Sequence, residues 1–442
     1  QKNKELKQEK IPVTNVINIL KKYQYILKDQ NYIIEDFKIN IKNNNGDDYN
    51  INLKNLELKF DNINNIEVNS LIQMNNAAAN LKISAKTTAG NAIDIKGRIV
   101  SDKQPEISNE LIIDKTNIKT HFKINFDTRL SHLNFVEKIN FDFIQSGITS
   151  VTNSNIFQNN LDINALNFKG EILNNFSKID IPYFTSKIDN KILIKGEINY
   201  EAKKLIADLN ILNLSTKKVL NIWSNNLLPE VHLWLSEHLK GGEVSNLMLE
   251  NDFNEQIKPS LTTSINLKNA HLKYLKNAPI VTLNTAEVKF TTKNLVISSV
   301  DGKVLNSSIN NVKAEIEDLN QEKLKMTFNA NIVGSISEQL RIANMHYKLQ
   351  EQKEVEGMAN TKINFVVPFD RVPTFEDLKF NLQSQLSDVV INGVYQNYQL
   401  TNGKLEVNLI GEKLKISGNA KINKLLNIFV DADILIKNNK NY

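Results

Sequence analysis

Residues 37–42 read Phe-Lys-Ile-Asn-Ile-Lys, with an apolar side chain at every second position. Successive side chains of a β-strand point to opposite faces, so this period of two predicts a strand with one apolar and one solvated face. The same alternation returns in the runs Leu56, Leu58, Phe60; Phe122, Ile124, Phe126; and Ile139, Phe141, Phe143. It predicts a mostly β chain of antiparallel strands with a few short helices.

Short polar connections separate these runs. Turn-forming residues cluster at Asn45-Gly46-Asp47, Asp301-Gly302, Asn392-Gly393 and Asn402-Gly403. Asn-Gly and Asp-Gly pairs supply the positive φ angles of tight hairpin turns. We therefore expect hairpins at these four places.

A glycine also recurs inside the alternating runs. The pattern apolar-x-apolar-Lys/Ser-Gly appears at residues 93–99 (IDIKGRI), 166–172 (LNFKGEI), 192–198 (ILIKGEI) and, more loosely, 414–420 (LKISGNA). A glycine within a strand marks a bulge or a sharp bend. Repeated bends would curl a sheet, so we expect a long curved antiparallel sheet. The copies are irregularly spaced, so no fixed-period repeat is predicted.

Composition excludes several classes of protein. The chain has 442 residues, 41% hydrophobic and 23% charged, enough for a core and for two or three domains. Its net charge of +5 rests on lysine, since arginine occurs only at Arg98, Arg129, Arg341 and Arg371. Arginine is the usual reader of phosphate and guanine, so no nucleic-acid partner is predicted. The lack of cysteine excludes disulfides, thiolate zinc sites and cysteine nucleophiles.

Catalytic and metal-binding motifs are missing from the sequence. None of the six histidines belongs to a His-Glu-x-x-His motif. His232 and His238 lie about 240° apart on a helix, too far round to share a metal. No nucleophile elbow, Walker loop or dinucleotide-binding glycine motif occurs. We predict no enzyme activity, no metal and no cofactor.

One stretch departs from strand alternation. Residues 215–250 read STKKVLNIWSNNLLPEVHLWLSEHLKGGEVSNLMLE and contain both tryptophans. We expect two short helices, the second beginning at Pro229, whose missing N–H costs nothing in a first turn. Its apolar face would contain Val231, Trp234, Leu235 and Leu239. Gly241 or Gly242 would end it in the left-handed conformation, and Trp223 and Trp234 would pack on the sheet.

Two further helices are expected. Val16, Leu20, Tyr23 and Leu27 form the apolar stripe of one, which would pack on the first strands or lie on a membrane surface. Residues 335–349 predict the other, capped by Ser335 or Ser337. No run approaches the ~18 apolar residues of a transmembrane helix, and no signal peptide is visible.

We divide the chain into four regions. These are an N-terminal amphipathic helix (1–30), an N-terminal β region (31–214), a helical insertion (215–245) and a C-terminal β region (246–442). The apolar strand faces would either meet a second sheet in a closed sandwich or line an open groove. An open groove suits an acyl chain, which gains roughly 0.8 kcal/mol per buried methylene. We expect its lining to include Ile265, Leu267, Val288, Phe290, Leu405, Val407, Leu414 and Ile416.

Residues 227–250 resemble a signature of the AsmA-like superfamily, specifically its YhdP-like branch. The pattern is a helix that begins at a proline and carries a late Trp-Leu pair, followed by Gly-Gly-x-Val. The matching positions are Leu228, Pro229, Trp234, Leu235, Leu239, Gly242 and Val244. The resemblance continues through residues 266–304 and 357–434 and is loose over residues 1–60.

This resemblance implies a long open β-groove that transports phospholipid between the inner and outer membranes without catalysis. It also implies a periplasmic location and an inner-membrane anchor, which would lie outside this chain, and it leaves any envelope protein partners unspecified. Two other functions remain open. One is a structural or adhesive extracellular β protein with a packed core. The other is a lysine-rich membrane-surface binder, whose binding salt would abolish.

Overall fold

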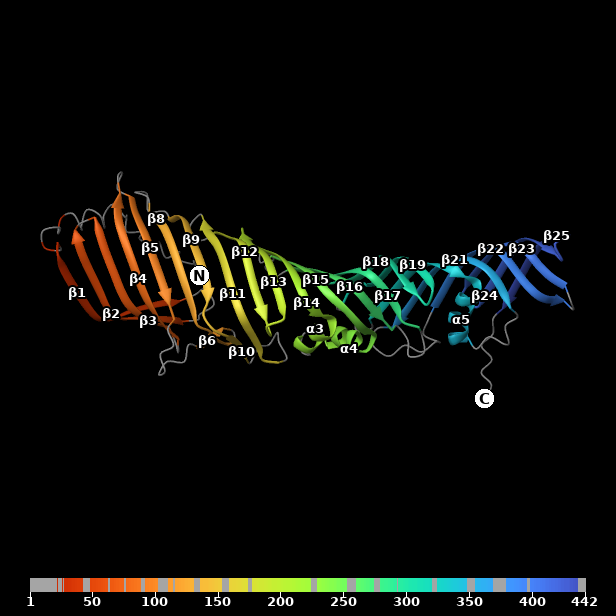
Figure 1. The fold of residues 1–442 in the computed structure, drawn as a ribbon, viewed down its shortest axis with the longest axis horizontal. Helices are drawn as coiled ribbons and strands as arrows, with labels where there is room; N and C mark the ends of the chain where they lie inside the picture. Colours follow the sequence, from red (N-terminus) through yellow and green to blue (C-terminus); the bar gives the residue numbers. More distant parts are fainter. Residues whose placement is uncertain are drawn as a thin grey trace, which may run out of the picture. The chain divides into compact units, whose positions relative to one another are not determined.

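Antiparallel strands make up nearly all of the computed structural model in Figure 1. It describes residues 22–435 except 23–25, 27, 43–47, 63, 75–76, 89–91, 102–109, 114–115, 131–135, 153–158, 174–176, 224–228, 253–259, 274–278, 292, 320–323, 348–353, 369–378 and 396–397. The chain divides into two compact units. Unit 1 comprises Gln1–Asn213 and Glu250–Pro259, and unit 2 comprises Leu214–Leu249 and Ser260–Tyr442.

Unit 1 is an antiparallel ladder in which most strands pair with their neighbour in sequence. Its strands are β1 (Gln30–Lys42), β2 (Asp48–Asn62), β3 (Asn65–Met74), β4 (Ala77–Thr88), β5 (Ala92–Val100), β6 (Glu110–Ile113), β7 (Thr116–Lys119), β8 (Phe122–Leu130), β9 (Val136–Gln145), β10 (Thr149–Thr152), β11 (Leu161–Leu173), β12 (Lys178–Ile188), β13 (Ile192–Glu201) and β14 (Lys204–Ser215). The exceptions are β5, which pairs with β8, and β9, which pairs with β11. The short strands β7 and β10 pair with each other.

Unit 2 continues the same plan with helices added. Its elements are α3 (Thr216–Ile222), α4 (Pro229–His238), β15 (Leu239–Asp252), β16 (Ser260–Leu272), β17 (Val281–Thr291), β18 (Leu295–Val304), β19 (Ser307–Ile316), β20 (Lys325–Ser335), α5 (Ile336–Tyr347), β21 (Val355–Pro368), β22 (Lys379–Tyr395), β23 (Tyr398–Ile410), β24 (Lys413–Ile422) and β25 (Leu426–Leu435). Strands β16 to β25 pair in sequence order, and β25 pairs only with β24 among the described strands. The predicted mostly β fold, with an open curved antiparallel sheet and a few short helices, is confirmed.

A line of bulges crosses four neighbouring strands of unit 2. Positive φ angles occur at Gly357 in β21, Asp388 in β22, Asn402 in β23 and Gly418 in β24. The pairing register shifts beside the first three of these residues. Bulges increase the local twist of a strand, so a row of them bends the sheet. We call this row the crease.

The three predicted turns that fall among the described residues are wrong. Asp301-Gly302, Asn392-Gly393 and Asn402-Gly403 lie inside β18, β22 and β23. A Cβ on Gly302 would lie 2.5 Å from the carbonyl oxygen of Thr282, so glycine here allows a neighbouring strand to approach. The β18–β19 hairpin turns instead at Leu305, whose φ is 54°. Asn45-Gly46-Asp47 lies outside the described residues.

The helical insertion has the predicted helices but not the predicted ending. Pro229 is the first residue of α4, as expected. The helix ends at His238, and Gly241 and Gly242 lie in β15, as does Leu239. The carbonyl of His238 accepts a hydrogen bond from the N–H of Lys273, the residue after β16, at 2.8 Å, so the helix end is capped without a left-handed glycine. Gly242 allows β16 to approach, because a Cβ there would lie 3.1 Å from the Cα of Ala270.

The predicted helix at residues 335–349 is confirmed as α5. The Ser335 hydroxyl accepts a hydrogen bond from the Glu338 N–H at 3.3 Å, which satisfies one free donor of the first turn. Of the helix predicted near residues 16–27, only Lys22 and Ile26 lie among the described residues. No described helix combines the length and the apolar character needed to cross a membrane.

Candidate functional site

The eight residues expected to line a groove all lie in unit 2, in strands β16, β17, β23 and β24. Directly paired residues of antiparallel strands point to the same face of a sheet. Ile265 pairs with Val288, and Leu267 and Phe290 lie two residues further along the same strands. Val407 pairs with Ile416, while Leu405 and Leu414 belong to the same alternating sets.

A continuous series of pairs joins these two groups. It runs through Val288–Ile297, Ile297–Ala314, Ala314–Phe328, Phe328–Phe365, Ile363–Leu382 and Leu382–Leu409. Ile363 and Phe365 lie two residues apart in β21, and Leu409 lies two residues after Val407 in β23. All eight predicted residues therefore share one face, which we call the inner face of unit 2.

Helices α3 and α4 cover part of this inner face. Trp223, Trp234 and Leu235 pack against a buried apolar cluster. The cluster consists of Leu295, Ile297, Ala314, Ile316, Leu324, Met326 and Phe365. The tryptophans therefore pack on the sheet as predicted. Val288 and Phe290 also lie against this cluster, so part of the predicted lining contacts the protein's own core.

Helix α5 covers a second part of the same face. Its Ile336 belongs to a buried cluster that includes Leu405, and Leu340 and Ile416 pack against this cluster. Hydrogen bonds hold the helix in place, because the Glu338 carboxylate accepts from the Ser307 hydroxyl at 2.6 Å and from the Asn306 N–H at 2.8 Å.

The charge of Glu338 is stabilised by its partners. Burial acts to raise the pKa of Glu338, but the hydrogen bonds from Ser307 and Asn306 and the charge of Arg341 outweigh it. The pKa of this carboxyl group therefore lies below its ordinary value of 4.5.

Unit 1 also has an inner face, defined by rows of directly paired residues. One row contains Ser70, Leu81, Ile99, Ile124, Phe143, Phe168, Phe184, Gly196 and Leu209. A neighbouring row contains Phe60, Ile66, Ala85, Ile95, Thr128, Ile139, Ile172, Ile179, Tyr200 and Leu205. Neither row has a charged member.

Phenylalanine rings are in contact along the middle of this inner face. Phe143 stacks on Phe168 with ring centroids 4.5 Å apart, and Phe122 stacks on Phe143 at 5.6 Å. Phe141 meets Phe168 edge-on at 6.0 Å. These four side chains are only partly buried, whereas Leu283 and Ile316 on the inner face of unit 2 are 0% and 1% exposed. Unit 1 thus keeps large apolar side chains accessible.

The opposite face of unit 1 is charged. Lys138 pairs with Glu171, Lys178 with Glu201 at 3.0 Å, and Arg129 with Asp94 at 3.7 Å. Exposed pairs of this kind contribute little stability, roughly 0–1 kcal/mol each. Because these charged residues lie opposite the apolar rows, one face of the ladder is solvated and the other is apolar.

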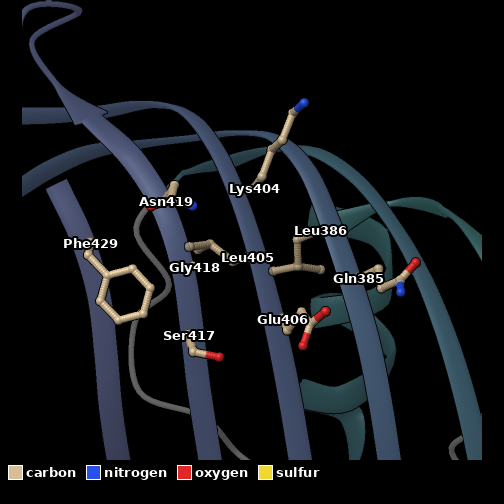
Figure 2. Close-up of a pocket in the computed structure, with 9 residues that line it drawn as sticks. All are labelled: Gln385, Leu386, Lys404, Leu405, Glu406, Ser417, Gly418, Asn419 and Phe429. Atoms are coloured by element: carbon tan, nitrogen blue, oxygen red, sulfur yellow. The ribbon is translucent and has the colours of Figure 1, made fainter. Parts of the chain in front are cut away.

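Unit 2 also has a depression that the sequence-based prediction missed. It has a volume of about 350 Å³ and is lined by Gln385, Leu386, Lys404, Leu405, Glu406, Ser417, Gly418, Asn419 and Phe429 (Figure 2). Only Leu405 of the eight predicted residues is among them. Among the described residues, no group of three or more His, Asp or Glu side chains is placed to hold a metal ion.

Fold and site together define a β protein whose sheets have one apolar and one solvated face. No protein-family model matches the chain, and neither a curated protein nor a solved structure does. The AsmA-like resemblance therefore remains a prediction from residues 227–250, 266–304 and 357–434.

Proposed function

We propose that the protein binds phospholipid acyl chains on its inner faces and conducts them between membranes without catalysis. The observation that carries this proposal is the charge-free, partly accessible inner face of unit 1. Its row from Ser70 to Leu209 crosses nine strands, which at ~4.8 Å per strand is roughly 40 Å. An acyl chain gains roughly 0.8 kcal/mol for each methylene buried there.

The resemblance to the AsmA-like superfamily supports the same proposal. It adds the location: the periplasm, between the inner and outer membranes of a cell envelope, with a membrane anchor outside this chain. The open antiparallel sheet is the kind of fold that this resemblance implies.

A second candidate function rests on unit 2. The packed apolar clusters among its described residues are what a structural or adhesive β protein with a packed core requires. That candidate predicts no uptake of lipid by either inner face.

The first test is lipid capture from vesicles. We expect the purified protein to extract a fluorescent phospholipid from phosphatidylethanolamine–phosphatidylglycerol vesicles and to retain it on re-isolation. Phe168→Glu places a charge in the aromatic row and should lower capture at least about tenfold, since a bound acyl chain would desolvate the carboxylate and a cost of only about 1.4 kcal/mol already lowers affinity tenfold. Tyr183→Glu is the matched control, because Tyr183 is 51% exposed and its strand neighbour Phe184 is the residue that pairs with Phe168 on the inner face.

Three further measurements keep this test decisive. The photoreactive analogue p-benzoylphenylalanine in place of Phe143 should cross-link to lipid, which requires no destabilising substitution. Val407→Glu tests the inner face of unit 2 in the same way. Capture that disappears at high salt would favour a lysine-rich membrane-surface binder, because salt screens attraction between charges but hardly affects the binding of acyl chains to an apolar face. If the wild-type protein captures no phospholipid, the packed-core alternative replaces this proposal.

A further inference from the structure

The depression of Figure 2 lies on the solvated face of unit 2, opposite the inner face. Gln385 pairs with Glu406 and Glu406 pairs with Ser417, while Lys404 pairs with Asn419 and Asn419 with Phe429. These six side chains alternate in sequence with inner-face residues such as Leu405, so they point away from the apolar clusters. They come from four adjacent strands, β22 to β25.

Gly418, which belongs to the crease, also lines the depression. Gly418 has a φ of 147°, and a Cβ on it would lie 2.2 Å from the carbonyl oxygen of Lys404. Two strands therefore approach one another at this point more closely than any side chain would permit. The spacing of β23 and β24 beside the depression is therefore set by backbone atoms.

The polar side chains around the depression are mostly exposed to solvent. Those of Gln385, Lys404, Glu406, Ser417 and Asn419 form no hydrogen bond or ion pair with other described residues. Elsewhere on the solvated face of unit 2 such groups are paired: Ser264 donates to Glu287 at 2.8 Å, and Asn364 donates to Asn329 at 2.6 Å. The depression thus combines unused donors with unused acceptors.

Phe429 adds an apolar surface to these polar groups. Its side chain is 67% exposed, the highest value among the exposed aromatic residues of the described chain. In β25 it occupies a position of the solvated face, where an aromatic ring gains nothing from packing in the core. A ligand with an apolar flank would cover this ring and bury its area.

We propose that this depression binds a neutral saccharide. A pyranose ring has hydroxyl groups at its edge and C–H groups on its faces. The amides, the hydroxyl, the ammonium and the carboxylate would bond the hydroxyl groups, and Phe429 would stack on the C–H face. The volume of about 350 Å³ lies within the range of small-molecule sites.

Charge argues for a neutral ligand. Lys404 lies two residues from Glu406 on the same face, so a phosphate attracted by the one is repelled by the other. An acyl chain would leave five polar side chains desolvated and unpaired. A neutral molecule that both donates and accepts hydrogen bonds avoids both costs.

The test is to titrate the full chain with cellotetraose and with the tetramer of N-acetylglucosamine, and to measure binding by calorimetry and by saturation-transfer NMR. We expect binding of at least one of them at millimolar concentration or below. Phe429→Ala and Glu406→Gln should each weaken it at least about tenfold, because each removes one of the two kinds of contact. The matched controls are Tyr183→Ala and Glu317→Gln, which alter an exposed aromatic ring and an exposed carboxylate elsewhere and should leave affinity unchanged.

Three results would overturn the proposal. The first is that neither tetrasaccharide binds at millimolar concentration, and the second is that Phe429→Ala binds like the wild type. The third is that inorganic phosphate competes, which would identify an anion site instead. Phe429→Ala should leave phospholipid capture unchanged, so the saccharide site and the acyl-chain face can fail independently of each other.

Discussion

Replacing Gly418 by alanine will lower the free energy of unfolding of unit 2 by about 2–4 kcal/mol. The cause is steric, because the new Cβ would lie 2.2 Å from the carbonyl oxygen of Lys404 and 2.9 Å from the Cα of Leu405. Both are backbone atoms of a paired strand, so no side chain can rotate away. The crease must open, and the pairs between β23 and β24 near Leu405 weaken.

This loss of unfolding free energy can be measured by urea unfolding monitored through tryptophan fluorescence. Both tryptophans, Trp223 and Trp234, belong to unit 2, so their emission reports on that unit. Gly411→Ala is the matched control, since Gly411 has a φ of 60° but nothing within 4 Å of the added Cβ. It should cost about 1 kcal/mol, the price of the left-handed conformation alone. Equal losses in the two variants would show that the close approach at Gly418 is not what requires glycine.

Glu338→Ala will lower the free energy of unfolding of unit 2 by about 2–4 kcal/mol. Glu338 is 8% exposed, and its carboxylate is the partner of the Ser307 hydroxyl and the Asn306 N–H. Ser307 is 0% exposed, so its hydroxyl would remain desolvated without this partner. Glu317→Ala removes an exposed carboxylate and should change stability by less than about 0.5 kcal/mol. A similar small effect from Glu338→Ala would mean that α5 is held by its apolar contacts and by the hydrogen bonds of Gln339 with Ala359 and Thr361.

Acid should act through the same carboxylate. Because the folded-state pKa of Glu338 lies below its ordinary value of 4.5, its contribution is fully present above that pH. The contribution is lost as the pH falls through the folded-state pKa. Glu338→Gln cannot titrate, so its unfolding free energy should fall less steeply below pH 4.5 than that of the wild type. Parallel pH profiles for the two proteins would contradict this assignment.

The inner face of unit 2 could be predicted from sequence because apolar residues at every second position identify one face of each strand. Val288 and Ile416 lie on the same face although six strands lie between β17 and β24 in the pairing order, because directly paired residues point to the same face. The aromatic row of unit 1 was visible only as separate runs. Which phenylalanines stack, such as Phe143 on Phe168, depends on register, which the sequence does not state.

Glycine positions were the least predictable feature. Asn402 adopts a positive φ of 51° inside β23, as a hairpin turn would also require, so the Asn-Gly pair alone cannot separate a bulge from a turn. Gly241 and Gly242 were misassigned for a related reason, because the helix end is completed by Lys273, which is remote in sequence. The bond between Glu338 and Ser307 likewise joins residues 31 positions apart. The depression could have been suspected from Phe429 alone, because an aromatic residue stands there at a solvated position of an alternating strand.

The order of strand pairing has a consequence for assembly. From β17 to β25 every strand pairs with the one before it, so each added strand closes only the loop that joins it to its neighbour. Loop-closure entropy grows with loop length, and folds dominated by such local contacts form quickly. The ladder can therefore grow strand by strand as the chain leaves the ribosome. Insertion or deletion of a whole hairpin would lengthen or shorten it without altering the strands already paired.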